Sequence, residues 1–350
     1  MKTLPTIRAS FMEPFCLIAQ DLGTPVESLL QALHLPAQLP AEKDLLLIEI
    51  PCWKFIHKVA VREACAVFGL MASDKKSWTE LSTLQPLFKD CQNLYELLKR
   101  LVFFAPLQSK TSRFAILEED DFIWFVDHRT RLLAEEKCIQ TELYTLLGMI
   151  QLVQTAAGKN WRPSEIHLTI RHSIEIAYAR QLNPSRLLFS QPFMKIAIPR
   201  SLLPLPLSKS VTNNQQATVD IDAYKPMPDS FTGLLTAAII PYLGMDCLNK
   251  KLIANLVDMS PRTLQRRLDQ TSSSYLSILN QARFIQAQTL LKASNLPLLD
   301  ISLMLGYQNA SSFTRAFRRW SGVTPKAFRG LFQEPHYGGE YSANKNCQAT

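Results

Sequence analysis

The chain has 350 residues, of which 47% are apolar, so it can bury a substantial core and is not globally disordered. Its formal net charge is +8, and residues 230–332 hold twelve basic and four acidic residues, which accounts for the whole excess. This asymmetry favours a polyanionic partner for one part of the chain only.

The first two hundred residues mix helical and strand patterns. Apolar residues recur at helical spacing in three stretches: 11–34, 93–104 and 135–157. Alternating or β-branched runs predict short strands on either side of an acidic turn within 111–128, and again at 166–170 and 186–189. We therefore expect an α+β domain with a small antiparallel sheet over residues 1–198.

A proline-flanked polar stretch, 199–229, predicts a linker because such a composition packs poorly. Beyond it the pattern is helix after helix, which predicts an all-α domain over 230–332. The polar segment 333–350 is expected to be a flexible tail.

A helix-turn-helix pattern occupies residues 249–270. The first helix has the apolar residues Leu252, Ile253, Leu256 and Val257, and residues 258–260 interrupt it. Ser260 is a favourable N-cap, and Pro261 suits the first helical position, where its missing N–H is not needed. Leu264 and Leu268 are expected on the inner side of the second helix, which turns its arginines outward.

A second unit of the same plan lies at 297–321. Its first helix is expected to be built on Ile301, Leu303, Met304 and Leu305 and to end at Gly306. Asn309 or a neighbouring serine can cap the following helix, whose inner side carries Phe313, Phe317 and Trp320.

The helical pattern 275–293 connects the two units. At the rise of an α-helix it spans roughly 29 Å, close to the repeat of roughly 34 Å at which the major groove returns to one face of DNA. One rigid helix could therefore hold two recognition helices in adjacent groove segments.

These motifs resemble a known family. The segment LQRRL after the serine cap, the run LGYQNASSFTRAFRRWSGVTPKAFR at 305–329, and their spacing are similar to the DNA-binding domain of AraC/XylS-type bacterial transcription regulators, over about 231–332. More loosely, NWRPSEIHLTIRH and LLFSQPFMKIAIPRSLLPLPL within 11–207 resemble the arabinose-binding-type N-terminal domain of one branch of that family. The resemblance implies a sequence-specific regulator of promoter DNA, an activator rather than a repressor, with RNA polymerase, a small-molecule effector and a second copy of the chain as further partners.

The resemblance also assigns roles by position. Base contacts are expected from the outer faces of the two recognition helices: Arg262, Gln265 and Arg266 on the first, and Ser311, Thr314 and Arg315 on the second. Arginine can bond guanine O6 and N7, and glutamine can pair with adenine N6 and N7. Phosphate contacts, which set register without reading sequence, are expected from Arg267, Arg318, Arg319 and Lys326.

Two positions depart from the family pattern. Asp258 stands in the first turn, where the family often has glycine; aspartate tolerates a left-handed backbone better than most residues, so the turn is expected to survive with some strain. Ala310 replaces a residue that is polar in many relatives, so the second unit is expected to read fewer bases and to serve more as an anchor to phosphates.

The role of the N-terminal domain stays open between two readings. A small molecule enters a pocket formed by Phe104, Phe114, Ile116, Trp124 and Phe125, or the same residues are plain core in a domain that only dimerises. An enzyme tethered to DNA and a nonspecific or architectural nucleic-acid binder are the alternatives from other classes. No phosphate loop or nucleophile elbow appears, so an enzyme is not favoured.

No cofactor and no metal are expected. His167 and His172 are five residues apart around a strand end, a poor chelating geometry. The seven cysteines are scattered without a Cys-x-x-Cys, and the N-terminus lacks the apolar run of a signal peptide, so we expect a cytoplasmic protein.

Overall fold

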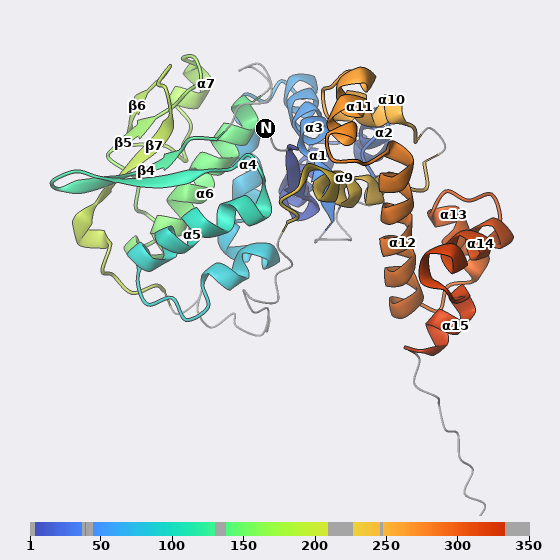
Figure 1. Ribbon diagram of the computed structural model, residues 1–350. Helices are drawn as coiled ribbons and strands as arrows, with labels where there is room; N and C mark the ends of the chain where they lie inside the picture. The colour runs from blue at the N-terminus through green and yellow to red at the C-terminus, as the bar shows by residue number, and fades with distance from the viewer. Residues whose placement is uncertain are drawn as a thin grey trace, which may run out of the picture. The chain divides into compact units, whose positions relative to one another are not determined.

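The computed structural model describes residues 4–36, 39, 45–129, 138–208, 227–245 and 248–332. The chain divides into two compact units: Met1–Tyr242 with Cys247–Leu279, and Leu243–Asp246 with Asn280–Thr350 (Figure 1). The helix α12 begins in the first unit and ends in the second.

The first unit contains a five-stranded sheet with the order β3-β4-β7-β5-β6. Its strands are β3 (Phe114–Glu118), β4 (Phe122–Asp127), β5 (Glu165–His167), β6 (Arg186–Leu188) and β7 (Met194–Pro199). All neighbours pair antiparallel except β5 and β6, which run parallel. A second, two-stranded sheet joins β1 (Thr6–Arg8) to β2 (Leu46–Ile48).

Helices make up most of the rest of the first unit. In chain order they are η1 (Ala9–Met12), α1 (Glu13–Asp21), α2 (Val26–Ala32), α3 (Glu49–Arg62), α4 (Phe68–Lys75), η2 (Trp78–Glu80), η3 (Ser82–Leu87), α5 (Leu94–Gln108), α6 (Ile139–Ala157), α7 (Ile174–Ala177), η5 (Arg200–Leu202), α9 (Phe231–Ile239), η7 (Ile240–Tyr242), α10 (Lys250–Leu256), α11 (Pro261–Asp269) and the start of α12 (Tyr275–Ala293).

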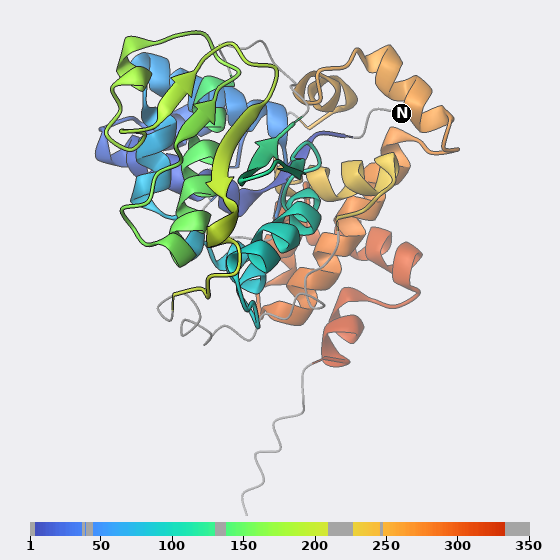
Figure 2. The ribbon, with the colours of Figure 1, turned by 90° about the vertical axis from the view of Figure 1, so that its left-hand side faces the viewer.

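One face of the five-stranded sheet belongs to the main core. Along β4, Ile123 and Phe125 join that core, whereas Trp124 and Val126 lie on the opposite face with Ala197 of β7. Figure 2 views the first unit from the side of its strands. The helices pack against the face that holds Ile123 and Phe125. Because side chains alternate between the two faces of a strand, successive residues of β4 have different surroundings.

Two glycines allow α6 to pack closely against its neighbours. A Cβ at Gly148 of α6 would lie 2.1 Å from the ring of Trp78. A Cβ at Gly69 of α4 would lie 2.0 Å from the carbonyl oxygen of Gln140, and the Gly69 N–H donates to the Gln140 Oε1 over 2.8 Å. The contact between α4 and α6 is therefore a backbone-to-backbone approach that a larger residue would block.

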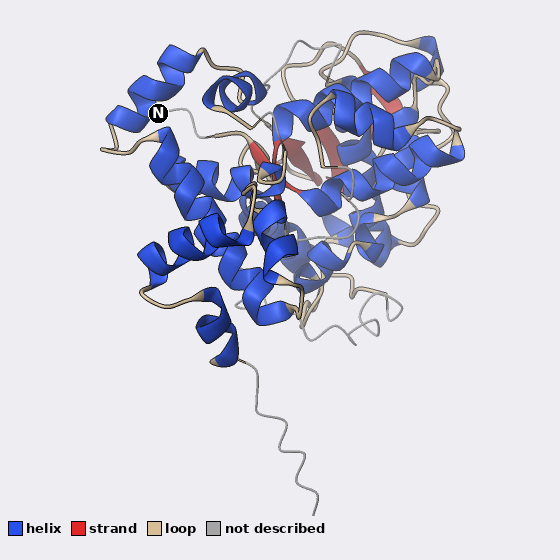
Figure 3. Ribbon diagram, turned by 90° about the vertical axis from the view of Figure 1, so that its right-hand side faces the viewer, coloured by secondary structure: helices blue, strands red, loops and turns tan. Residues whose placement is uncertain are grey.

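In the described part of the second unit every regular element is a helix (Figure 3). These are the later part of α12, α13 (Leu298–Met304), α14 (Ala310–Ser321) and α15 (Pro325–Gly330). The rings of Phe284, Phe313, Phe317 and Phe328 pack at centroid distances of 5.3–5.8 Å and form its core.

The expected α+β domain followed by helices is confirmed, with differences in detail. The expected antiparallel sheet is present, except that β5 and β6 are parallel. The stretch 11–34 holds two helices, α1 and α2, separated at Gly23, which has a φ of +81°. The strand expected at 166–170 ends at His167, and the pattern did not predict β7, the strand between β4 and β5.

The central part of the proposed linker, 209–226, and the tail 333–350 lie outside the described residues. The described part of this stretch before residue 209 is packed: Leu207 is buried, and the N–H of Leu94 donates to the carbonyl of Leu205 over 3.1 Å. The helix α9, which begins the region expected to bind DNA, packs against β2 within the first unit. The domain boundaries therefore stay a prediction.

Candidate nucleic-acid interface and effector pocket

Local hydrogen bonds define the first helix-turn-helix unit. The Asn249 side chain accepts from the N–H of Leu252 at the start of α10, and Ser260 accepts from the N–H of Thr263 at the start of α11. Pro261 stands at the first position of α11, as expected. Leu264 and Leu268 have no exposed surface, so the opposite side of α11 faces solvent.

The turn between α10 and α11 passes through a left-handed residue. Asp258 has a φ of +54°, which confirms the expected backbone conformation. Asp258→Gly should leave the free energy of unfolding unchanged or slightly raised, since glycine adopts this conformation without strain but loses more chain entropy on folding. Asp258→Val should lower it by about 1–2 kcal/mol. Chemical denaturation measures both variants; a glycine variant that fails to fold would contradict this role.

The outer face of α11 carries the predicted base-contacting residues. Arg262 and Arg266 are exposed, and Gln265 is half-buried. The Gln265 Oε1 accepts from the Lys250 Nζ over 3.1 Å, and its Nε2 donates to the Asp269 Oδ1 over 2.8 Å. These residues line a surface hollow of about 430 Å³ together with Pro261. Lys250 was not among the predicted site residues, because it lies fifteen positions before Gln265.

Arg267 differs from the other predicted phosphate contacts. It is half-buried, and its guanidinium carbon lies 5.3 Å from the centroid of the Phe231 ring. This contact holds part of the side chain on α9, whereas Arg318, Arg319 and Lys326 are exposed.

The second helix-turn-helix unit repeats the plan. Gly306 ends the α13 segment with a φ of +75°, and a Cβ there would lie 2.4 Å from the carbonyl oxygen of Leu243. Asn309 caps α14 by accepting from the N–H of Ser312 over 2.8 Å. The expected apolar side of α13 is partly wrong: Ile301 and Leu305 are buried, but Leu303 and Met304 are about half exposed.

The faces of α14 follow the prediction. Phe313 and Phe317 have no exposed surface and Trp320 is half-buried, with its ring 5.8 Å from that of Phe284. Ser311 and Arg315 are exposed and Thr314 is half-buried on the other side. Gly322 ends α14 with a φ of +80°, and Thr324 caps α15, at whose first position Pro325 stands. The outer face of α14 is therefore open to a partner.

The described helices of the second unit carry mainly positive charge. Between 280 and 332 the sequence has a single acidic residue, Asp300, against seven basic ones. Arg283 is structural: its Nε donates to the carbonyl of Leu305 over 3.0 Å and its guanidinium carbon lies 4.6 Å from the Tyr307 ring centroid. The exposed arginines of α14 have no carboxylate partner among the described residues.

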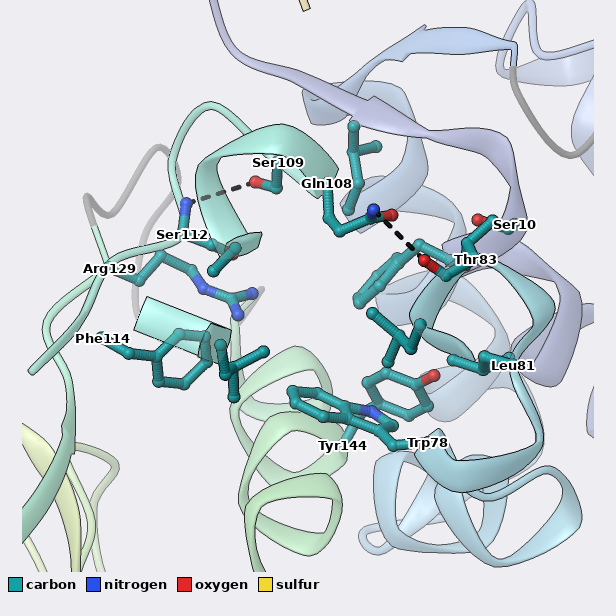
Figure 4. A pocket seen from close by; sticks show the side chains of 15 residues that line it. Ser10, Trp78, Leu81, Thr83, Gln108, Ser109, Ser112, Phe114, Arg129 and Tyr144 are labelled. Carbon is teal, nitrogen blue, oxygen red and sulfur yellow. Dashed lines mark hydrogen bonds between the residues drawn. The ribbon is translucent and has the colours of Figure 1, made fainter. Parts of the chain in front are cut away.

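A cavity of about 60 Å³ lies inside the first unit (Figure 4). Of the five residues expected to form an effector pocket, Phe114 lines this cavity. Phe104 and Phe125 belong to the surrounding main core, and Ile116 is half-buried against it; Phe125 stacks on Phe114 at a centroid distance of 5.4 Å. Trp124 is on the opposite face of the sheet, where its Nε1 donates to Glu119 over 2.7 Å. The strand pattern did not show which face was internal, since both faces of β4 are apolar.

Most of the cavity wall comes from segments that the sequence pattern did not connect. It is lined mainly by apolar side chains from β1, η1, η3 and α5, with Trp78 and Tyr144 on one side and Arg129 on another (Figure 4). Three buried polar atoms lie in this wall: Arg129 Nε has no hydrogen-bond partner among the described residues, whereas Trp78 Nε1 and Tyr144 Oη interact with each other. Burial raises the pKa of Tyr144, so its hydroxyl keeps its proton.

A buried carboxylate lies beside this cavity. Glu49 has no exposed surface and accepts hydrogen bonds from Thr111 Oγ1 at 2.7 Å and Ser109 Oγ at 3.0 Å. Burial raises the pKa of Glu49 to about 7, although the Thr111 hydroxyl and the positive charge of Arg129 lower it.

The raised pKa makes stability depend on pH. Between the ordinary value of 4.5 and about 7 the folded state binds more protons at Glu49 than the unfolded state, so the free energy of unfolding falls as the pH rises through that window. The change amounts to about 3 kcal/mol. Glu49→Gln should remove it, so that the variant is more stable relative to the parent at pH 8 than at pH 5. Urea denaturation at both pH values measures the difference; an equal difference would contradict the assignment. The neighbouring carboxylate of Asp127 is present in both proteins, so it is held constant in this comparison.

Two family models match the chain. The arabinose-binding domain of AraC transcription regulators matches residues 23–207, more than half of the chain, and a helix-turn-helix domain matches residues 253–330. The chain belongs to the AraC family of transcription regulators. This family comprises regulators rather than enzymes, and the helix-turn-helix match runs from within α10 to the end of α15.

Individual relatives of this AraC-family chain match over shorter stretches. The ornithine utilization regulator of Pseudomonas aeruginosa is 30% identical over 144 residues, 40% of this chain and 42% of that protein. The transcriptional activator CsvR of Escherichia coli is 35% identical over 82 residues, 23% of this chain and 31% of that protein. The chain thus spans about a fifth to two fifths of the length of the curated relatives it matches.

Among solved structures, the transcriptional regulator CdpR of Pseudomonas aeruginosa matches 87% of this chain and 96% of its own, with 15% identity and a TM-score of 0.39.

Within the described ranges, no three His, Cys, Asp or Glu side chains gather as metal ligands would. No helix in the described part of the chain combines the length and the apolar character needed to cross a membrane.

Proposed function

We propose that this AraC-family protein is a sequence-specific regulator that reads adjacent major-groove segments of promoter DNA with α11 and α14. One observation carries the proposal: each of these helices is capped after a turn with a left-handed residue, buries an apolar pair, and turns arginines outward. Arg262, Gln265 and Arg266 would contact bases from α11, and Ser311, Thr314 and Arg315 from α14. Arg267, Arg318, Arg319 and Lys326 would contact phosphates.

The regulator would act as an activator, in the cytoplasm, as a homodimer that contacts RNA polymerase at the promoter. The relative CsvR of Escherichia coli is a transcriptional activator, which supports activation over repression. A signal at the N-terminal domain would change how the DNA-binding domain engages its site.

Mapping the bound DNA fragments across the genome tests the proposal and yields the operator. Specific binding should survive an excess of random DNA, whereas binding through the phosphate backbone alone should not, and should weaken steeply with salt. Loss of all binding in excess random DNA would favour the nonspecific or architectural binder instead.

We further propose that the cavity beside Trp78 and Tyr144 is the effector site, and that it takes a small, mainly apolar molecule with a hydrogen-bond acceptor. Its wall offers apolar side chains together with the buried donors of Trp78, Tyr144 and Arg129. A sugar would need hydrogen bonds around most of its surface, whereas the surface of this cavity is mainly apolar. At about 60 Å³ the cavity would have to widen for most effectors. The rival reading is a purely structural cavity, since this volume suits about two water molecules.

Thermal denaturation with cyclohexanone and with arabinose as probes separates these readings. A ligand of the native state raises the midpoint with concentration. We expect a rise with cyclohexanone, none with arabinose, and none in Ala105→Leu, which fills the cavity from α5. A response to neither probe would support a structural cavity, and an equal response in Ala105→Leu would place the ligand elsewhere.

A further inference from the structure

The amide of Gln265 is held from two sides before any DNA is present. Lys250 Nζ donates to its Oε1 over 3.1 Å, and its Nε2 donates to Asp269 Oδ1 over 2.8 Å. Gln265 and Asp269 are four residues apart on α11 and therefore on the same face. Lys250 is the first residue of α10, and the helix-turn-helix fold brings it to that face.

The chemistry of the two partners determines which way the amide points. An ammonium group can only donate hydrogen bonds, so it must face the amide oxygen. A carboxylate can only accept, so it must face the amide nitrogen. Turning the amide by half a rotation would set donor against donor and acceptor against acceptor, and both contacts would be lost.

The held amide still has capacity to bind. Its oxygen has a second lone pair and its nitrogen has a second N–H. Adenine offers the matching pair in the major groove, an N6 donor and an N7 acceptor. Guanine offers two acceptors there, O6 and N7, so its O6 would face the amide oxygen without a hydrogen bond.

We propose that Lys250 and Asp269 are positioning residues that hold Gln265 in the orientation that reads adenine. The inference rests on the proposed entry of α11 into the major groove. It assigns Asp269 a role that its charge alone argues against, because a carboxylate near phosphates weakens binding. Lys250 offsets that charge, so the pair adds no net charge to the face.

This arrangement gives the Asp269→Asn variant a distinctive pair of effects. The asparagine has the same shape but can donate or accept, so it no longer fixes the amide. Preference for adenine over guanine at one base pair should fall by roughly tenfold. Affinity for random DNA should rise, because a negative charge has been removed. A residue that only stabilised the fold would not improve one property while reducing the other.

Lys250 provides a matched comparison. Lys250→Met removes the donor and should reduce the adenine preference at the same base pair. Lys250→Arg keeps a group that can only donate, and should retain the preference. Both variants should leave the preference at every other base pair unchanged.

In the test, the full chain and each variant select DNA from a library of random duplexes. The bound DNA is then sequenced, which gives the base preference at each position. In Gln265→Ala the preference at one base pair should disappear, and adding Asp269→Asn to it should change nothing further. If Asp269→Asn has the same effect with and without Gln265, or if Lys250→Arg behaves like Lys250→Met, positioning is overturned. If Gln265→Ala alters no base preference, the base-reading role of Gln265 fails, which is a separate result.

Discussion

Arg266→Ala is expected to weaken binding to the cognate DNA site by about 1–3 kcal/mol, roughly 5- to 150-fold, and to relax the preference at one base pair. Arg266 is exposed on α11, on the side opposite the buried Leu264 and Leu268. From there its guanidinium can reach O6 and N7 of a guanine in the major groove. Titrations of labelled operator and of random duplex at one salt concentration give both affinities.

Lys326→Ala is the control for this prediction. Lys326 is exposed on α15 and is predicted to contact phosphate, so its loss should weaken binding to every sequence alike. It should also lower the salt dependence by about one counterion. If both variants lost affinity equally for operator and random DNA, Arg266 would be a phosphate contact and the assignment of base contacts on α11 would be wrong.

Gly69→Ala is expected to lower the free energy of unfolding of the first unit by about 1–3 kcal/mol or more, because overpacking a core usually costs this much. The added Cβ would meet the Gln140 backbone at 2.0 Å, and backbone cannot yield as the end of a flexible side chain can. The variant should also strain the hydrogen bond from the Gly69 N–H to the Gln140 side chain. The midpoint of denaturation, followed by tryptophan fluorescence, measures the loss.

Gly330→Ala is the matched control. An added Cβ at Gly330 meets no described atom within 4 Å, and the residue lies in the helix α15. Alanine is favoured over glycine in a helix, so stability should stay the same or rise slightly. A Gly69→Ala protein as stable as the parent would show that α4 and α6 separate easily.

The helix ends of the DNA-binding domain could be predicted because their causes are local. Ser260 and Asn309 cap their helices by bonding to an N–H three residues ahead, so the cap is visible in a few letters of sequence. The left-handed turn at Asp258 is similar, since it depends on one residue and its two neighbours. The buried pair Leu264 and Leu268 follows from helical spacing alone.

The N-terminal domain was predicted less completely because its order depends on distant pairing. The strand β7 has alternating Met194, Ile196 and Ile198 but lies beside a proline-rich stretch, and only its pairing with β4 and β5 shows that it is internal. The strands β1 and β2 are three residues long and about forty residues apart, so neither has a readable pattern.

By itself, the sequence determined the separation of charge along the chain, the succession of helices after residue 230, and the capped turns that present arginines outward. These properties follow from composition and from contacts within about four residues. Only the tertiary structure decided that Trp124 turns away from the cavity while Phe114 lines it, and that Lys250 and Asp269 together hold Gln265. The reason is physical. The spacing of residues along the sequence indicates which side of a helix or strand a residue lies on, but the fold of the whole chain decides what that side contacts.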